Sequence, residues 1–306
     1  MYSAKKQHNV DILLGIIDLH AVLHIAKYGA SARGISKKDE DTFLIHNFLY
    51  KFRHICTKLP DAHIVFTCDS MKSKRKEIFD MYKFRRGSKT DEQIYLDSIA
   101  FPQFAAIKEY VLPTIGYRNV IEEEGYEADD VIAAICKRYP INNKIIVTED
   151  KDLYQLLSNN TAILTPKNCK FYTTEDFKEE YGIRPSRWAE VKTLGGCASD
   201  NIPGIHNITA SGAVSQKCFG EKTALKYIRG EMSKNSTQYR SVSDERNKDV
   251  TERNRKLVTL PYEGMPEVKI KANKLSFVKF IEVAEHYGFD VIKEDAEVFK
   301  RILRLK

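Results

Sequence analysis

The sequence predicts an α/β fold in which helices flank a central, mostly parallel sheet. Short, continuous apolar runs of the kind that form fully buried strands occur at Ile12–Ile17, Ile64–Cys68 and Ile145–Val147. An amphipathic stretch, Thr42–Leu59, lies between the first two runs, so this part of the chain has the order strand, helix, strand. Parallel strands joined in this way form a right-handed crossover unit, from which open sheets are built.

The other elements follow in chain order. We expect, in turn, strand 11–18, helix 19–30, helix 42–59, strand 64–68, helix 91–112, strand 117–121, a helix that begins at 127–130, strand 145–147, and strands 162–164 and 169–172. From Thr173 the alternation stops, and we expect helices at 173–181, 185–194 and 277–287. We therefore predict an α/β domain over residues 11–182, which includes a basic arch at 70–115, and a helical domain over 183–306. Residues 230–256 are predicted to be a polar, charged connection, either flexible or an exposed helix.

Carboxylates gather at the ends of the predicted strands and at the start of one helix. Seven of them stand at such positions: Asp18, Asp69, Glu127, Asp129, Asp130, Asp150 and Asp152. Because ligands collect at the carboxyl ends of parallel strands, we expect these groups to converge. Clustered carboxylates repel one another unless a cation neutralises them, and oxygen ligands without His or Cys favour Mg²⁺ or Mn²⁺ over zinc. The alternative is a scattered set of helix caps and strand-end acids with no shared site.

A basic segment follows Asp69 directly. It carries eight cations: Lys72, Lys74, Arg75, Lys76, Lys83, Arg85, Arg86 and Lys89. Three aromatic residues are interleaved with them: Phe79, Tyr82 and Phe84. Cations bind phosphates and aromatic rings stack on unpaired bases, so the segment is typical of nucleic-acid binding. A solvated helix face is the alternative, but the position directly after a strand-end acid favours a segment that overhangs the acidic edge.

Two glycine-bracketed stretches mark the second half of the chain. Leu194–Gly204 is a turn that contains Asp200, and Gly220 precedes a helix whose first turn holds Lys222 and Thr223. A glycine turn with free N–H groups at a helix start is a phosphate-binding arrangement.

Composition limits the class of protein. The 306 residues include 49 basic and 42 acidic side chains, for a net charge of +7, and the strand-end and helix-start acids described above are concentrated at one place. The rest of the surface is therefore more basic than the total indicates, which favours a polyanionic partner. Six widely spaced cysteines without a CxxC pair indicate a reducing compartment, and no apolar run approaches the roughly 18 residues of a membrane span. We expect an intracellular, cytoplasmic protein that is not secreted and does not contact a membrane.

Seven motifs then occur in a fixed order. They are IID at Asp18, TCDS at Asp69, YKFRR at Lys83–Arg86, YEADD at Glu127–Asp130, TEDKDLYQLL with Asp150 and Asp152, SDNIPGI with Asp200, and FGEKTA at Gly220. This order resembles the 5′-nuclease family, which comprises phage flap endonucleases, 5′ to 3′ exonucleases and the 5′-nuclease domain of bacterial DNA polymerases. The resemblance covers roughly residues 12–228, with a weaker similarity at 253–261. It implies a PIN-like 5′-nuclease fold with a helical arch above a two-metal site, and a C-terminal helical region of the helix–turn–helix type that holds duplex DNA.

The resemblance also implies roles for individual residues. The first metal would be held by Asp18, Asp69, Glu127, Asp129 and Asp130, and the second by Asp150, Asp152 and Asp200. Lys83 would act as the catalytic lysine that meets the scissile phosphate, with Arg86 as its basic companion. DNA would be contacted by Lys72, Lys74, Arg75, Lys76, Arg85, Lys89, Gly204, Gly220, Lys222 and Thr223, and K⁺ is expected at the helix–turn–helix element.

By the same resemblance, we expect a phosphodiester hydrolase that uses two Mg²⁺ ions, with Mn²⁺ able to substitute. Its substrates would be 5′ ends, flaps and junctions of DNA, nicked DNA, and RNA primers in RNA–DNA hybrids, in replication or repair. We expect a monomer that works with a replication polymerase, clamp or single-strand-binding protein. Two alternatives stay open: a structure-specific DNA-binding protein that has lost nuclease activity, and a ribonuclease built on the same acidic sheet. A phosphatase of the aspartyl-phosphate type is excluded because no DxDx[TV] follows Asp18.

The sequence departs from the family pattern at three places. Cys197 stands where the family usually has an acid three residues before the one matching Asp200, and a neutral thiol is a poor Mg²⁺ ligand. Ile25 replaces a basic residue, for which Lys27 is the nearest substitute. His206–Phe219 is about ten residues longer than the compact family turn.

Overall fold

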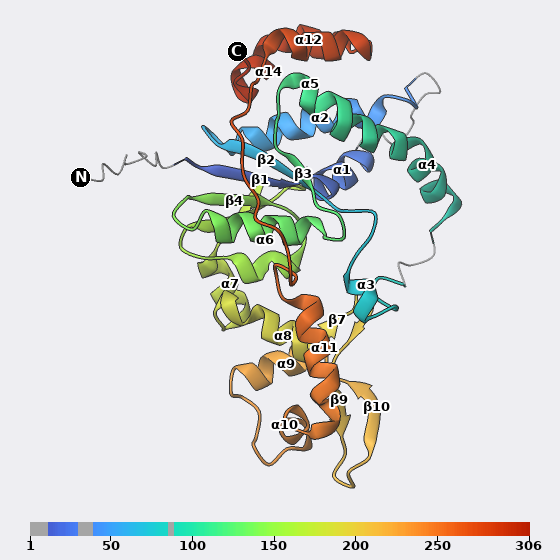
Figure 1. The fold of residues 1–306 in the computed structure, drawn as a ribbon, viewed down its shortest axis with the longest axis vertical. Coiled ribbons are helices and arrows are strands. Elements are labelled where there is room, and N and C mark those ends of the chain that lie inside the picture. Colours follow the sequence, from blue (N-terminus) through green and yellow to red (C-terminus); the bar gives the residue numbers. More distant parts are fainter. Residues whose placement is uncertain (1–11, 30–38, 85–88) are drawn as a thin grey trace, which may run out of the picture.

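The computed structural model describes residues 12–29, 39–84 and 89–306. In these residues the central sheet has six strands in the order β3-β2-β1-β4-β5-β6 (Figure 1). Their bounds are β1 (Leu14–Asp18), β2 (His63–Cys68), β3 (Val120–Glu122), β4 (Lys144–Val147), β5 (Thr161–Thr165) and β6 (Lys170–Tyr172). Neighbouring strands are parallel, except that β6 runs antiparallel to β5. The predicted mostly parallel sheet is therefore confirmed.

Both faces of the sheet are buried, and the alternation of side chains along β1 shows why. Ile17 packs in one core together with Phe66 of β2, whereas Ile16 packs in the other together with Val65 and Ile146. Successive side chains of a strand point to opposite faces, so a strand covered on both sides must be apolar throughout. This accounts for the continuous apolar runs in the sequence.

Helices cover the two faces as separate layers (Figure 1). One layer contains α1 (Leu19–Lys27), α2 (Phe43–Cys56) and α5 (Leu112–Ile115). The other contains α6 (Ala128–Arg138), α7 (Thr174–Tyr181) and, further along, α8 (Trp188–Gly195) and α9 (Glu221–Ile228). Short 3₁₀ helices at η3 (Lys151–Leu156) and η4 (Pro185–Arg187) connect these elements.

The C-terminal helices correct the predicted boundary between domains. The helices α12 (Phe277–His286), α13 (Asp290–Glu294) and α14 (Ala296–Leu303) lie at the end of the molecule opposite α9, where α14 packs against α2 and α12 packs against α5. Phe280 and Phe299 are fully buried in the same core as the α1–α2 layer. Residues 183–306 are thus not one spatial unit, because the apolar side chains of the C-terminal helices belong to the core that contains α2, some 250 positions earlier in the chain.

The extended segment before α12 follows the sheet edge and is held by side-chain amides. Asn119 donates to Lys271 O at 2.6 Å and accepts from Lys271 N at 2.7 Å, while Asn273 donates to Ile64 O at 2.9 Å. Asn119 is buried, so these hydrogen bonds replace those it would make to water.

Residues 230–256 are folded and are not a flexible connection. They form α10 (Thr237–Val242), the 3₁₀ turn η5 (Glu245–Asn247) and most of α11 (Lys248–Val258), which lies beside α8. Buried polar groups help to hold them in place. Asn254 donates to Thr193 O and Pro203 O at 3.1 and 2.8 Å, and Asn247 accepts from His206 N and donates to His206 O, each at 2.9 Å.

Replacing Asn247 with alanine is expected to lower the free energy of unfolding by about 2 kcal/mol, because buried backbone groups of His206 and Ser241 lose their partner. Urea denaturation followed by circular dichroism measures the change. Asn159→Ala, at an exposed turn position, is the matched control and is expected to be neutral. An unchanged midpoint for Asn247→Ala would contradict the anchoring role.

Residues 70–115, the predicted arch, contain α3 (Arg75–Ile78), α4 (Asp91–Ala106), the π-helical stretch η2 (Ile107–Val111) and α5. Arg85 and Arg86 lie outside the described residues. The helix α3 lies beside α11 and α4 leans outward from the α1–α2 layer, so the described parts flank the sheet edge where the strands end (Figure 1). The helix α4 begins at a capping box, in which Thr90 and Gln93 exchange hydrogen bonds of 3.3 and 3.0 Å.

The glycine-bracketed turn forms two hairpins between α8 and α9. The first is β7 (Gly196–Cys197) with β8 (Ile202–Pro203), and the second is β9 (His206–Ile208) with β10 (Val214–Cys218). The second hairpin accounts for the extra residues 206–219 and projects at the lower end of the molecule (Figure 1). The two helices stay adjacent: a Cβ added at Gly195 would lie 3.0 Å from Glu221 N. The simple helix–turn–helix that we expected is therefore replaced by two helices joined through two hairpins.

Candidate metal centre

Strand ends bring three of the predicted carboxylates to one edge of the sheet. Asp18 is the last residue of β1, Asp69 follows β2, and Asp150 lies three residues beyond β4. Thr148 connects two of them, because its hydroxyl donates to Asp18 at 3.0 Å and accepts from Asp150 N at 3.0 Å. The expected convergence of strand-end acids thus occurs.

The start of α6 adds carboxylates at the same edge. Asp69 accepts a hydrogen bond from Ala128 N at 2.8 Å, which joins the end of β2 to the first turn of α6. The Asp129 carboxylate is close enough to be repelled by those of Asp150, Asp18 and Asp69. Four acids from four chain segments therefore share one electrostatic environment.

This crowding shows in the pKa values. Burial and the nearby Asp69 raise the pKa of Asp18 to about 7. Burial, followed by the charges of Asp150, Asp18 and Asp69, raises the pKa of Asp129 well above its ordinary value. Desolvation and Asp152 likewise raise the pKa of Asp150, although its side chain stands on the open side of the cluster. In the absence of a cation the cluster resists being fully ionised.

The metal-free protein is expected to become less stable as the pH rises from about 4 to about 7, because the carboxyl groups of this cluster then ionise. The folded-state pKa of Asp18 lies above the ordinary 3.8, so its contribution is fully present below about 4 and is lost as the pH passes about 7. A divalent cation at 100 times its Kd should then add about 2.7 kcal/mol at neutral pH. Thermal unfolding at several pH values, with EDTA or with Mg²⁺ or Mn²⁺, measures both effects. A metal-induced rise in Tm that is as large at pH 4 as at pH 7.5 would contradict this assignment.

Asp130 differs from its neighbours, and here the expected ligand set needs correction. Its side chain is fully buried and receives Arg75 in a bidentate pair at 2.6 and 2.8 Å. It also accepts from Glu127 N at 3.1 Å and Tyr262 N at 2.7 Å. With both oxygens engaged by the fold, Asp130 acts as a structural anchor, and Arg75 is held away from phosphates.

Glu127 is bound by side chains of the arch. It accepts hydrogen bonds from Tyr82 and Lys83 at 2.9 Å each and from Ser73 at 3.0 Å. Burial opposes ionisation of this carboxyl, but Lys83 and Arg75 outweigh it and lower the pKa of Glu127 below its ordinary value.

Lys83 reaches into the cluster from the arch. Besides its contact with Glu127, its ammonium lies 4.0 Å from Asp200, and its backbone N–H donates to Asp200 O at 2.8 Å. Burial works against its charge, yet Glu127 and Asp200 prevail and raise the pKa of Lys83. A permanent cation therefore stands between the two groups of acids.

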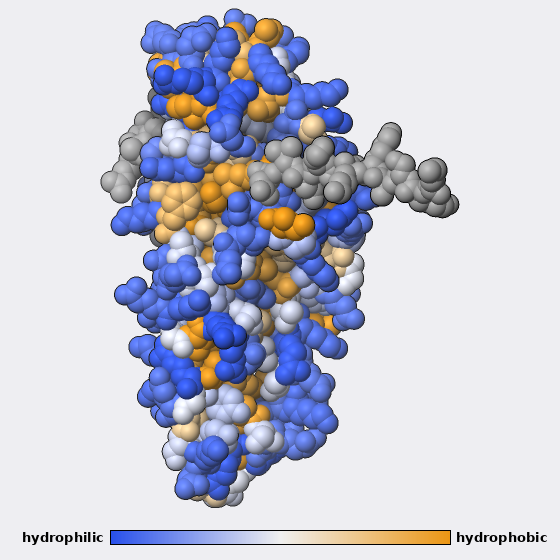
Figure 2. Space-filling view, turned by 90° about the vertical axis from the view of Figure 1, so that its left-hand side faces the viewer, coloured by the Kyte–Doolittle hydropathy of each residue, from blue (hydrophilic) through white to orange (hydrophobic). Residues whose placement is uncertain are grey.

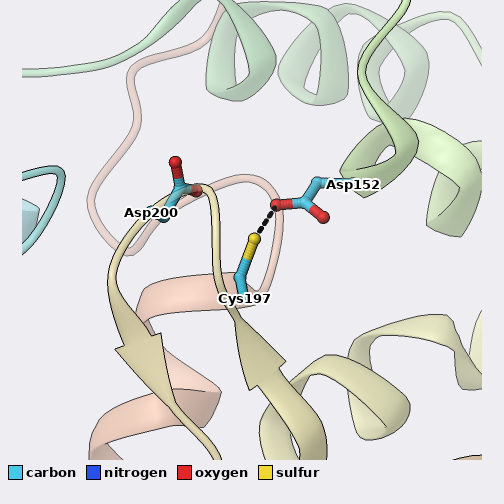
Figure 3. A group of neighbouring side chains, drawn as sticks. All are labelled: Asp152, Cys197 and Asp200. Carbon is cyan, nitrogen blue, oxygen red and sulfur yellow. Dashed lines mark hydrogen bonds between the residues drawn. The ribbon is translucent and has the colours of Figure 1, made fainter. Parts of the chain in front are cut away.

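A second group of ligand atoms lies beside the first. One ligand atom each from Asp152, Cys197 and Asp200 lies within 4.8 Å of the other two (Figure 3). Burial, with Asp152 next, raises the pKa of the Cys197 thiol to about 12, and burial also raises the pKa of Asp200 to about 6.

Lys192 of α8 was not singled out by the sequence. Its side chain is buried and its ammonium lies 3.1 Å from Asp152 and 3.6 Å from Glu221. A lysine in a helix is normally solvated, so nothing local indicated this position. Lys27, the expected substitute for the missing basic residue, is instead paired with Asp97 of α4 and does not serve the cluster.

The cations predicted to bind DNA fall into different environments. Lys72 pairs with exposed Glu124 at 3.4 Å, Lys74 donates to Tyr126 at 2.8 Å, and Lys89 pairs with Asp97 at 2.6 Å. Lys76 and Lys222 are exposed and Thr223 is half-buried. These positions stay predictions.

The aromatic rings of the basic segment, and the two glycines predicted to contact DNA, also lie in different environments. Tyr82 is buried and cannot stack on a base, whereas Phe84 is 70% exposed. A Cβ added at Gly204 would meet Phe219 O at 2.2 Å, so this glycine is required by close chain packing. Gly220 faces open space at the start of α9, where a phosphate contact has room.

Solved structures with this fold bind DNA and metal ions. The chain is similar to the bacteriophage T5 flap endonuclease solved with DNA and metal ions, with a TM-score of 0.64 and 18% identity over 95% of this chain and 98% of that one. It is also similar to flap endonuclease-1 from Methanococcus jannaschii, with a TM-score of 0.56 and 12% identity over 96% of this chain and 93% of that one. At these identities the similarity defines the fold, which is that of the 5′-nucleases.

Residues 13–182 match the family described as 5′-3′ exonuclease, N-terminal resolvase-like domain, and the chain belongs to this family. It is 37% identical over 174 residues to the 5′-3′ exonuclease of Bacillus subtilis, covering 55% of this chain and 52% of that protein. It is 37% identical over 163 residues to the thermostable DNA polymerase I of Thermus thermophilus, covering 51% of this chain and 16% of the polymerase. The matched region therefore spans about half of the exonuclease and a small part of the polymerase. Among the described residues, no helix has the length and apolar character needed to cross a membrane.

Proposed function

We propose that this chain is a divalent-metal-dependent 5′-nuclease, which hydrolyses phosphodiester bonds at 5′ ends, flaps, nicks and junctions of DNA and in RNA primers on DNA. The observation that carries the proposal is the convergence of Asp18, Asp69, Asp129 and Asp150 beside the half-buried ammonium of Lys83. Membership of the exonuclease family supports the same reaction. We place its role in replication or repair in the cytoplasm.

The donor chemistry of the first group of acids suits a hard divalent cation. Asp18, Asp69 and Asp129, with Asp150 beside them, offer only oxygen donors, as Mg²⁺ and Mn²⁺ prefer. Their mutual repulsion, evident in the raised pKa values, is what a cation would relieve. When bound, such a cation supplies Lewis-acid stabilisation of charge on the phosphate. The second group contains a thiol and does not fit Mg²⁺.

The protein's own side chains would bind and orient the scissile phosphate. Lys83 lies between Glu127 and Asp200. An incoming phosphate oxygen would displace one of these carboxylates and accept a hydrogen bond from the Lys83 ammonium. The charge that develops on the phosphate in the transition state would then be offset at short range in a partly buried site. Exposed Phe84 offers a stacking surface, and Gly220, Lys222 and Thr223 would contact the duplex phosphates. K⁺ at that element stays a prediction.

The experiment is a panel of 5′-labelled flap, nicked, blunt and RNA–DNA hybrid substrates, with Mg²⁺, Mn²⁺, Ca²⁺ or EDTA and length-resolved products. The wild type should cleave at or near the 5′ junction only with Mg²⁺ or Mn²⁺. Asp150→Ala should abolish cleavage and retain DNA binding in Ca²⁺, while Glu149→Ala, the exposed neighbouring acid, should cleave normally.

Two results would replace the proposal. Tight binding of branched DNA without cleavage under any metal would indicate a DNA-binding protein that has lost its activity. Cleavage confined to RNA strands would indicate a ribonuclease. The same panel with a replication polymerase, sliding clamp or single-strand-binding protein tests the expected partners.

A further inference from the structure

The second group of ligand atoms has a composition that Mg²⁺ does not favour. Cys197 is 4% exposed and its sulfur lies 3.6 Å from Asp152 Oδ2, with Asp200 completing the group (Figure 3). A soft sulfur donor in place of an oxygen changes which metal binds best, because thiolates select thiophilic ions such as Zn²⁺.

The spacing of these donors already suits such an ion. A Zn–S bond of about 2.3 Å and a Zn–O bond of about 2.1 Å at a tetrahedral angle place the two donors roughly 3.6 Å apart. The Sγ–Oδ2 distance between Cys197 and Asp152 is 3.6 Å. The pair therefore needs little movement to hold a tetrahedral cation.

The backbone around Cys197 is fixed. Gly196 has a φ of +72°, and a Cβ added there would meet Ile202 O at 2.3 Å. The short β7–β8 hairpin therefore sets the direction of the next side chain, while Ser199 lies 3.0 Å from its sulfur. A ligand carried on such a rigid turn is preorganised for binding.

Lys192 orients the second donor. Its ammonium lies 3.1 Å from Asp152 Oδ1, which leaves Oδ2 directed toward Cys197. Two carboxylates and a thiolate would balance a divalent cation together with this ammonium, so the occupied group is electrically neutral. Metal ligands are commonly fixed by such outer partners.

From this geometry we propose that the second position binds a thiophilic divalent cation, of the Zn²⁺ class, through the Cys197 thiolate with Asp152 and Asp200, in place of Mg²⁺. The inference deepens the proposed nuclease function and rests on it for the meaning of the site. When the metal–sulfur bond forms, the thiol proton passes to solvent, and no electron is transferred. The first position keeps its preference for a hard cation.

The test is metal binding by the full-length protein without DNA. Protein stripped with EDTA is titrated with Co²⁺, a spectroscopic substitute for Zn²⁺, and the sulfur-to-cobalt charge-transfer absorption in the near ultraviolet is recorded. Calorimetry with Zn²⁺ and with Mg²⁺ gives the affinities. The wild type should show the band, and Cys197→Ser should lose it together with at least about tenfold of the Zn²⁺ affinity, since even outer-shell changes cost that much.

Two further variants complete the design. Cys218→Ser, which alters a half-buried cysteine outside this group, should keep the band and the Zn²⁺ affinity. Cys197→Asp should lose the band and gain affinity for Mg²⁺, because it restores an oxygen-only donor set. Each variant is first shown by circular dichroism to be folded.

The outcomes separate this inference from the proposed function. A cobalt band that survives in Cys197→Ser, or a Zn²⁺ affinity unchanged by that substitution, would overturn the inference while leaving Mg²⁺-dependent cleavage untouched. Binding of extra Co²⁺ only after Lys192→Met would also overturn it, since the ammonium would then occupy the cation position. A Cys197-dependent band in a protein that cleaves no substrate would support the metal site and count against the nuclease.

Discussion

Arg75→Met is expected to lower the free energy of unfolding by about 3 to 5 kcal/mol, the cost of removing one partner of a buried ion pair. Arg75 is 3% exposed and its guanidinium forms a bidentate pair with fully buried Asp130. Its Nε also donates to Leu257 O at 2.8 Å. Methionine keeps most of the side-chain volume, so the lost stability would come from the buried Asp130 carboxylate left without its partner and not from a cavity.

Urea denaturation at pH 7.5 with EDTA measures this effect without interference from metal binding. Lys72→Met, which removes a cation of the same basic segment whose side chain is 81% exposed, is the matched control and should change stability by less than about 1 kcal/mol. A loss of similar size in both variants would show that the buried Arg75–Asp130 pair contributes no more to stability than an exposed ion pair does. The consequence reaches beyond stability, because this pair joins α3, the start of α6 and the end of α11 around the acidic edge.

The prediction also shows where sequence reasoning stops. Lys74, Arg75 and Lys76 are three consecutive cations, and nothing local indicates that the middle one turns inward. Its partner Asp130 lies 55 positions later, next to Asp129, whose carboxylate belongs to the acidic cluster instead. Buried Asn247 and Lys192 were missed for the same reason. The burial of a polar side chain depends on partners that are distant in the sequence, and the local sequence pattern does not show them.

The strand-end acids were predictable because their signal is local. Each follows a run of buried apolar residues, so the residue types that form the strand also mark its end. The parallel order of the strands then brings Asp18, Asp69 and Asp150 to one edge without further information. The return of α12–α14 onto α2 depends on a complementary surface far away in the chain, and the sequence pattern of those helices could not specify it.

Asp129→Asn is expected to separate stability from activity at that edge. The substitution keeps the size of the side chain and removes a charge that burial and the carboxylates of Asp150, Asp18 and Asp69 all disfavour. In EDTA at pH 8 the variant should therefore unfold at a higher temperature than the wild type. The difference should shrink as the pH falls through 4, because the wild-type carboxyl, whose ordinary pKa is 3.8, then becomes protonated in the unfolded state as it already is in the folded state.

With Mg²⁺ present the order should reverse, because the variant lacks a ligand that the cation would use. Cleavage of a 5′-labelled flap should fall by more than about a hundredfold, since changes one shell further out already cost about 10- to 100-fold in other metal sites. Glu124→Gln, which neutralises an exposed carboxylate that lies 3.4 Å from the ammonium of Lys72, should affect neither measurement. A variant that is less stable than the wild type in EDTA would mean that Asp129 holds the fold together. Raised stability combined with undiminished cleavage would mean that the metal is held elsewhere, and either result would remove Asp129 from the centre of the proposed site.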